Sequence, residues 1–245
     1  MRVEQIKVDS DVLRRNVLAI HDFQENDDLA CEEVAYRTKF SPIYVSCCVA
    51  LDALALIHRL EDHGFRLAEC KIRTCVKLQK LFDVSHYPYI YERVTSLDCL
   101  EDVLEIAGST VTHDRFTTDM AISRGLSGER YRNYVVQSFT SPDQEVWRLY
   151  CPLTKKTLNF RTHRVVSSRE VLLLLGGVHP DLKGLGIGPI ASYFCLNELY
   201  ARGFRRATTH ISAINAPIAN LEIGNLGFRV IGAFAVLRKV YGDGL

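Results

Sequence analysis

Runs of alternating and helically spaced apolar residues divide much of the chain into expected strands and helices. The segment "PIYVSCCVA" (42–50) is rich in strand-forming residues, and "RLAECKIRTCVKL" (66–78) alternates between polar and apolar positions. Between them, "LDALALIHRLEDHGF" (51–65) has helical spacing and ends near a glycine. This order predicts a strand, a helix and a second strand.

The rest of the chain continues the alternation. "SLDCLEDVLEIAG" (96–108) predicts a helix, and 113–139 predicts a loop followed by an aromatic, arginine-rich helix. Three strands are expected at "EVWRLYCP", "TLNFRTHRVV" and "EVLLLLGGV", then a helix from Gly186, a strand at "RATTHIS", a shorter helix and a last strand at "FRVIGAFAVLRKVY".

These elements predict an α/β (α+β) fold with a mixed central sheet flanked by helices. Aromatic residues and Pro88 interrupt the pattern after the first block, which suggests a boundary near residue 85. We therefore expect a small αβ N-terminal domain at 1–85 and a larger domain at 86–245. No internal repeat is found in the sequence.

Composition narrows the functional classes. Hydrophobic residues make up 47% of the chain, which is enough for a core, and 30 basic against 29 acidic residues argue against a nucleic-acid partner. The N-terminus has no apolar leader and no apolar run approaches the ~20 residues of a membrane span, so we expect a cytoplasmic protein without a membrane partner.

The cysteines and histidines give no sign of a metal or disulfide site. The eight cysteines form no CxxC pair and are interpreted as reduced core thiols, none of them a nucleophile. His58 and His63 are five positions apart, whereas two ligands on one helix face need a spacing of four. We expect no metal.

The strongest chemical signal is a glycine-rich segment, "GGVHPDLKGLGIG" (176–188), which follows the apolar run "VLLLL". A strand that leads through glycines into a helix presents backbone N–H groups and the positive end of the helix dipole, and this arrangement binds phosphate. Lys183 adds a cation. The alternative is a plain glycine-rich turn. The segment lacks both GxxxxGK[ST] and the third glycine of the dinucleotide fingerprint.

Within this segment, "VHPDLKGLGIG" (178–188) resembles the acyl-CoA signature of the GCN5-related N-acetyltransferase (GNAT) family, (Q/R)xxGx(G/A), with Lys183 in the Gln/Arg place. Downstream, "HISAINAPIANLEIGNLGFRV" (210–230) is similar to the family's "N…A…LY…LGF" segment. The resemblance covers residues 170–240. It implies a GNAT fold, acetyl-CoA as co-substrate and acyl transfer.

The resemblance also implies roles for particular residues. A splayed strand ending near Val178 would bind the pantetheine arm, and the loop 183–188 would cradle the pyrophosphate. The residues expected to contact the coenzyme are Gly177, Val178, Lys183, Gly184, Leu185, Gly186, Ile187, Gly188, Asn215 and Asn220.

More loosely, the chain resembles the subfamily that acetylates the 4-amino group of dTDP-linked deoxysugars such as dTDP-fucosamine. The segment 45–78 looks like its small N-terminal αβ domain, and "DRFTTD…ERYRNYVVQSF" (114–139) looks like its acceptor segment. Arg115 and Phe116 would then hold the acceptor by ion pairing and stacking. The alternative for this pair is a solvated charge beside a core ring.

One position departs from the family pattern. Seven residues after Asn215 the family has a tyrosine, taken as the acid that protonates the thiolate, whereas this chain has Glu222 and no tyrosine between Asn215 and Phe228. Glu222 is therefore a candidate catalytic residue, the alternative being a solvated residue on a short helix. His210 is the second candidate, and His179 is also considered because histidine titrates near neutral pH.

The sequence thus predicts an enzyme that transfers an acetyl group from acetyl-CoA to a primary amine of a small molecule, with a nucleotide-linked amino-deoxysugar as the expected acceptor. Two alternatives stay open: a non-catalytic acyl-CoA-binding module, and an N-acyltransferase that uses a longer acyl-CoA. A homodimer is also left open.

Overall fold

The computed structural model describes residues 1–79, 81–110, 113, 115–123 and 125–242. The strands form one ten-stranded sheet in the order β1-β2-β3-β10-β4-β9-β8-β7-β6-β5. They are β1 (Arg2–Gln5), β2 (Val17–His21), β3 (Tyr44–Ala50), β4 (Arg66–Lys77), β5 (Ile90–Arg93), β6 (Gln144–Cys151), β7 (Lys156–Val165), β8 (Glu170–Val178), β9 (Arg206–Ser212) and β10 (Arg229–Val240).

Two units with the same order of elements are built into this sheet. The first is β2, helix α2 (Leu29–Phe40), β3, helix α3 (Leu54–Asp62) and β4. The second is β8, helix α7 (Ile187–Ala201), β9, the short helix α8 (Ala216–Ala219) with the π-helical turn Asn220–Asn225, and β10. In each unit the first two strands are parallel. The structure therefore contains a repeat that the sequence did not reveal.

A short sequence match accompanies the structural repeat. The last strand of each unit is entered through Gly-Phe-Arg, at Gly64 and at Gly227, and the same three residues at Gly203 also lead into β9. Gly64 and Gly227 have positive φ, 82° and 77°, a backbone conformation that side-chain-bearing residues rarely adopt. Three residues are too few to reveal a repeat in a sequence of this length.

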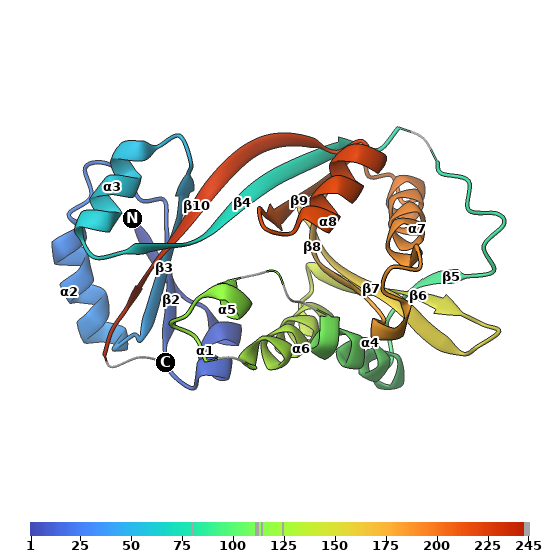
Figure 1. The fold of residues 1–245 in the computed structure, drawn as a ribbon, viewed down its shortest axis with the longest axis horizontal. Helices are drawn as coiled ribbons and strands as arrows, with labels where there is room; N and C mark the ends of the chain where they lie inside the picture. Colours follow the sequence, from blue (N-terminus) through green and yellow to red (C-terminus); the bar gives the residue numbers. More distant parts are fainter. Residues whose placement is uncertain (80, 111–112, 114, 124, 243–245) are drawn as a thin grey trace.

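The two units exchange their last strands. β10 pairs with β3 of the first unit, β4 pairs with β9 of the second unit, and β4 and β10 also pair with each other. Figure 1 shows these two long strands running side by side from one half of the molecule to the other. The expected boundary near residue 85 falls between β4 and β5, but the sheet is continuous, so the division into two domains stays a prediction.

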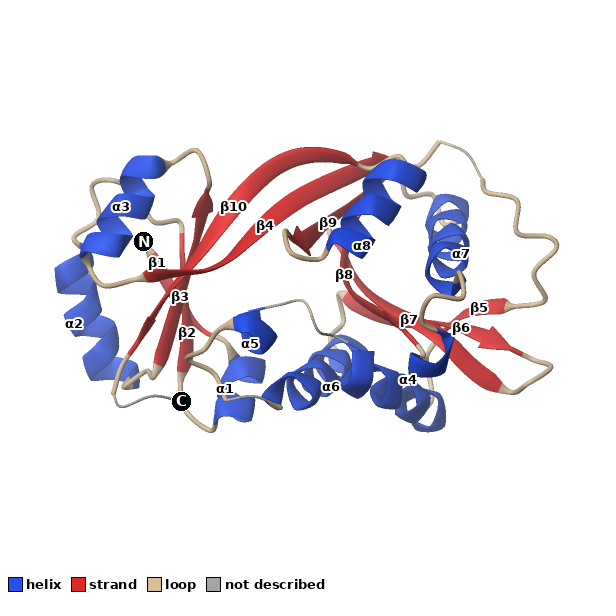
Figure 2. Ribbon diagram, viewed as in Figure 1, coloured by secondary structure: helices blue, strands red, loops and turns tan. Residues whose placement is uncertain are grey.

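Helices cover both faces of the sheet (Figure 2). α7 and the π-helical turn share a core with β8 and β9 that includes Leu173, Leu196 and Leu226. Helices α4 (Leu97–Thr110) and α6 (Leu126–Thr140) share another with β6 and β7, through residues such as Val135 and Phe160. No described helix is both long and apolar enough for a bilayer crossing.

The first unit has its own cores. α2 and α3 pack against β2, β3 and β10. On another side, helices α1 (Lys7–Leu13) and α5 (Arg115–Thr118) lie near Val17 and Tyr44.

The predicted mixed α/β fold is confirmed, and the three successive strands predicted before the glycine-rich segment are β6, β7 and β8. The structure adds β1, α1, β2 and α2 in the first forty residues, for which no elements were predicted. α2 has no distinct apolar stripe, and β1 and α1 are short, so the hydrophobic pattern in this region is weak.

Candidate functional site

The site begins where β8 leaves β9. The two strands are paired in parallel from Glu170↔Arg206 to Leu173↔Thr209 and no further. At the same level the register of β8 against β7 slips by one residue, with Leu174 as the extra residue of a bulge. Bulges bend a strand and are frequent beside active sites. Past Leu174, one edge of β8 therefore lacks a neighbouring strand.

The free edge of β8 carries backbone groups for a ligand. The N–H of His179 bonds back to Leu158 of β7. Because successive N–H groups of a strand point to opposite edges, the N–H of Val178 points to the edge that has left β9. This is the orientation that the expected contact with the coenzyme requires. The Val178 side chain packs near Ile187 at the start of α7.

The loop after β8 leads into α7 through two glycines with positive φ. Gly184 has φ 80°, and Gly186, at the N-cap of α7, has φ 81°. A Cβ on either glycine would meet nothing within 4 Å. Lys183 and Leu185 are exposed in the same loop, and Gly188 lies in the first turn. The first N–H groups of α7, including that of Ile187, have no partner within the helix, so this end is suited to an anion.

Other glycines of the segment serve packing. A Cβ on Gly177 would come within 2.5 Å of the Thr110 hydroxyl and 2.8 Å of the Phe160 ring. Gly177 thus lets β8 approach α4, a role separate from the expected coenzyme contact. His179 accepts a hydrogen bond from the N–H of Asp181 at 3.3 Å and caps the 3-10 turn Pro180–Leu182 that enters the loop.

Glu222 and His210 lie on opposite faces of the sheet near the point where the strands part. Thr74 of β4 is the partner of Thr209, the last residue of β9 that pairs with β8, and the Thr74 hydroxyl donates to Glu222 Oε2 at 3.1 Å. The next pair along is Arg73↔His210. Since side chains alternate along a strand, His210 and Arg73 point to the face opposite Glu222.

Glu222 is buried, with 4% of its surface exposed, so the alternative that it is a solvated residue is wrong. It sits in the π-helical turn, a type of distortion that often marks functional sites. Burial raises the pKa of this carboxyl, while Arg161 and the hydrogen bond from Thr74 act in the opposite direction. A carboxyl in this environment can hold a proton at a higher pH than a solvated one.

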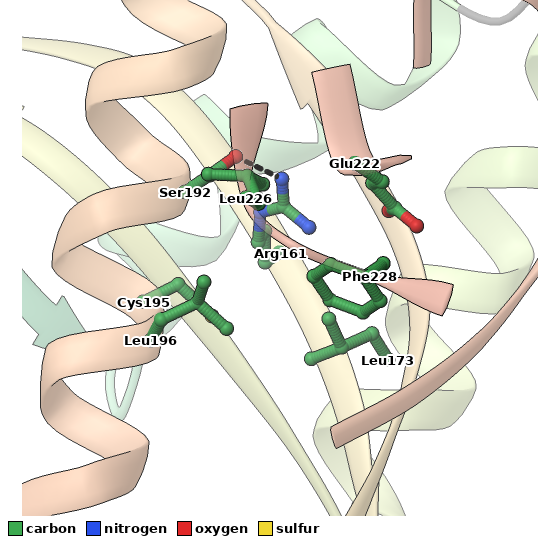
Figure 3. Close-up of a pocket in the computed structure, with 8 residues that line it drawn as sticks. All are labelled: Arg161, Leu173, Ser192, Cys195, Leu196, Glu222, Leu226 and Phe228. Carbon is green, nitrogen blue, oxygen red and sulfur yellow. Dashed lines mark hydrogen bonds between the residues drawn. The ribbon is translucent and has the colours of Figure 1, made fainter. Parts of the chain in front are cut away.

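Glu222 lines a small pocket between α7, the π-helical turn and the sheet, together with Arg161, Leu173, Ser192, Cys195, Leu196, Leu226 and Phe228. Figure 3 shows the Arg161 guanidinium between Ser192 and Glu222. Its Nη2 donates to Ser192 Oγ at 2.6 Å, and its Nε is buried without a partner. The side chains leave no room for a water molecule.

His210 is exposed on the other face, next to the Phe234 ring at a centroid distance of 6.1 Å. Partial burial lowers the pKa of its imidazole, and the positive charges of Arg73 and Lys71 lower it further. At neutral pH the ring is therefore neutral and able to accept a proton.

Arg115 and Phe116 are committed to the protein interior. Arg115 Nη2 pairs with Asp9 at 3.0 Å, and the Arg115 side chain is 12% exposed. Phe116 is 1% exposed, and the Arg130 guanidinium lies over its ring at 4.0 Å. The expected stacking on an acceptor does not agree with these positions. Of the alternative, the core ring agrees with the position of Phe116, whereas the solvated charge does not agree with that of Arg115. The preceding residue of the quoted motif, 114, lies outside the described residues.

The two asparagines differ in role. Asn215 accepts a hydrogen bond from the Ile218 N–H at 3.4 Å and caps α8, whereas Asn220 is exposed at the start of the π-helical turn. The structure therefore assigns Asn215 a capping function, and no contact tests the expected coenzyme role of either residue. The described residues contain no group of three or more potential metal ligands.

Sequence reasoning missed Thr74, Arg73, Arg161 and Ser192. Arg161 lies on β7 opposite Gly176, and Thr74 and Arg73 come from the first unit through the strand exchange. No local motif marks any of them. For Thr74 and Arg73, the only available signal was that charged residues occur within the alternating pattern of 66–78. This pattern predicts a strand but does not show which other strand pairs with it.

The fold places the chain among known structures. No protein-family model matches it, and no curated protein does so either. A GCN5-related N-acetyltransferase from Sphaerobacter thermophilus superposes with a TM-score of 0.67 at 15% identity, over 99% of this chain and 77% of that one.

Two further structures agree with this. A GCN5-related N-acetyltransferase from Kribbella flavida gives a TM-score of 0.65 at 13% identity, over 93% of this chain and 82% of that one. A tandem GNAT protein from the clavulanic acid biosynthesis pathway gives 0.62 at 12%, over 94% and 76%. At these identities the likeness concerns the fold, and the fold of this chain is that of GCN5-related N-acetyltransferase structures.

Proposed function

We propose that this protein is an acyl-CoA-dependent N-acyltransferase that moves an acetyl group from acetyl-CoA to a primary amine of a small molecule. The observation that carries the proposal is the parting of β8 from β9 at the Leu174 bulge, beside a glycine-capped helix N-terminus. The likeness of the fold to GNAT structures supports it.

On the donor side, the free edge of β8 near Val178 binds the amides of the pantetheine arm. The loop 183–188 and the first turn of α7 hold the pyrophosphate, and Lys183 supplies a solvated cation. The Val178 N–H is available to the carbonyl oxygen of the thioester, whose negative charge grows as the tetrahedral intermediate forms.

On the acceptor side, His210 acts as general base. It is exposed, directly follows the last β9 residue that pairs with β8, and has a lowered pKa. The amine nitrogen attacks the thioester carbon, the C–S bond breaks, and the proton lost by nitrogen passes to the imidazole. We assign the proton for the departing thiolate to Glu222, whose pKa is raised by burial.

The pocket around Glu222 leaves no room for a water molecule, so the acyl group has to lie outside it. Leu173, Leu226 and Phe228 fill the space between the sheet, α7 and the π-helical turn. An acyl chain entering this pocket would have to displace these side chains. We keep a nucleotide-linked amino-deoxysugar as the expected acceptor.

The test combines binding with turnover. We expect acetyl-CoA to bind in calorimetry and amines to cause thiol release, with kcat/KM falling as the pH drops below the ordinary histidine value of 6.5. His210→Gln should reduce kcat about a hundredfold, the lower range for general base catalysis, and remove this acid limb. His58→Gln, on an exposed face of α3, is the control and should behave as wild type.

The main alternative, a non-catalytic acyl-CoA-binding module, makes a different prediction. It is motivated by Glu222 at the position of the family tyrosine. Acetyl-CoA binding without thiol release on any amine, dTDP-linked amino sugars included, would favour it. Absence of acetyl-CoA binding would contradict both functions.

A further inference from the structure

The face of the sheet that carries His210 also carries a line of charged side chains. Arg73 of β4 lies directly opposite His210 of β9, and Lys71 lies opposite Ser212 and Phe234 on its two neighbouring strands. Side chains of directly opposed residues in an antiparallel pair are within contact distance of each other. Arg73 and His210 are thus immediate neighbours at the place where β8 and β9 part.

Four other described basic side chains near this face are each paired with a carboxylate. Lys71 lies 3.4 Å from Glu69, and Arg238 bonds Asp119 at 2.9 Å. Arg115 and Arg130 both bond Asp9.

Arg73 differs from all of them. It makes no hydrogen bond or ion pair with any other residue in the described part of the chain. Its Nε is buried without a partner, as is the Nε of Arg115, but Arg73 has no described carboxylate on its other nitrogens. A buried guanidinium N–H that forms no hydrogen bond is costly. The natural partner of a guanidinium is a planar or tetrahedral oxyanion. None of the described residues supplies one, because the described carboxylates near this face bond other basic side chains.

We propose that the acceptor is an amine that carries an acidic group, a carboxylate or a phosphate, and that Arg73 binds this group and so holds the amine beside His210. This inference rests on the proposed function for the identity of the acceptor. The anion site itself is a property of the sheet face and can be tested without turnover.

The first experiment follows the imidazole of His210 by NMR during pH titrations. Sodium phosphate, acetate and chloride are compared at equal ionic strength, and the His210 signal is assigned by its absence in His210→Gln. An anion held by Arg73 lies beside the ring and favours its protonated form. The pKa of His210 should therefore rise in phosphate or acetate relative to chloride.

Two variants locate the effect. In Arg73→Gln the apparent affinity of the anion, measured from the shift in the His210 pKa, should fall at least tenfold, because a charge-assisted hydrogen bond is lost. Arg66→Gln is the matched control: Arg66 begins the same strand, is exposed, and donates only to the backbone carbonyls of Glu61 and Phe65. This variant should keep the full shift. An equal response to all three salts, or one that survives Arg73→Gln, would overturn the proposal.

Turnover supplies the second arm and separates the carboxylate from the phosphate. Matched amines are compared: β-alanine with 3-aminopropanol, and O-phosphoethanolamine with ethanolamine. Wild type should prefer the acidic member of at least one pair, and Arg73→Gln should reduce that preference about tenfold or more while acetyl-CoA affinity is unchanged. Preference for the neutral amines would contradict the inference and leave the acyltransferase proposal intact. An anion effect on the His210 pKa without acetyl-CoA binding would support the anion site and contradict the acyltransferase proposal.

Discussion

At the scale of single residues, burial decides what Glu222 can do. Its carboxyl is buried near the Arg161 guanidinium and apolar side chains, with one hydrogen bond from Thr74. Burial raises its pKa above the ordinary 4.5. A raised carboxyl pKa means that the folded state binds a proton more tightly than the unfolded state. Its favourable contribution is therefore complete below pH 4.5 and is lost as the pH rises through the raised value.

Glu222→Gln tests this directly. The amide is neutral at every pH and can still accept from Thr74. The variant should therefore melt at a higher temperature than wild type at pH 8, and the difference should be small at pH 4. If Glu222 also supplies the proton to the thiolate, kcat should fall about a hundredfold with acetyl-CoA affinity unchanged. If the difference in melting temperature between the variant and wild type is the same at both pH values, the raised pKa is contradicted. Normal turnover would exclude the acid role.

The sequence could supply Glu222 and His210 as candidates, but it could not say that they lie on opposite faces of one sheet. That depends on the alternation of Thr74 and Arg73 along β4, a strand that comes from the other unit. For Arg115 and Phe116, the sequence suggested a binding role that the fold does not support. An Arg-Phe pair in a loop-like segment fits a binding site as a sequence, whereas the fold uses it to anchor α5 to Asp9 and the core.

At the scale of elements, the glycine-rich loop and α7 were the most predictable part of the chain. Their signal is local: a strand, glycines and the start of a helix are consecutive in sequence, so no distant contact is needed to recognise them. The repeat of βαβαβ units was not predictable, because it lies in the order of elements and leaves only Gly-Phe-Arg in common.

Gly186 provides the sharpest test of this element. Gly186→Glu forces a side chain into positive φ, which costs ~1–2 kcal/mol, and places a negative charge at the expected phosphate position. We expect acetyl-CoA binding to be lost in calorimetry. Gly203→Glu is the matched control, since Gly203 follows the other end of α7, has φ 94°, and has nothing within 4 Å of a built Cβ.

The two variants should lose similar stability, yet Gly203→Glu should still bind acetyl-CoA as wild type does. Normal binding by Gly186→Glu would show that the loop is not the pyrophosphate site. Loss of binding in both variants would point to a general effect on folding.

At the scale of the whole molecule, the exchange of β4 and β10 joins the two units. Ala235 and Leu237 of β10 complete the core that α2 and α3 build on β3, and Thr74 of β4 completes the surroundings of Glu222. Each unit therefore contributes buried residues to the other. A cut near residue 85 would remove β10 from the core of the first unit and β4 from the surroundings of Glu222. The candidate site depends on this arrangement because Arg73 and Thr74 both belong to the first unit.

A fragment experiment tests this dependence and the expected domain boundary together. Residues 1–85 lack β10, so β3 loses one neighbour, β4 loses both, and the core around Leu60 and Phe65 is opened. We expect this fragment to show no cooperative thermal transition by circular dichroism, and to regain one when mixed with residues 86–245, with acetyl-CoA binding measured on the mixture. A fragment that melts cooperatively by itself, with β4 taking the place of β10 beside β3, would mean that the first unit is an independent domain and that the exchange is not needed for its folding.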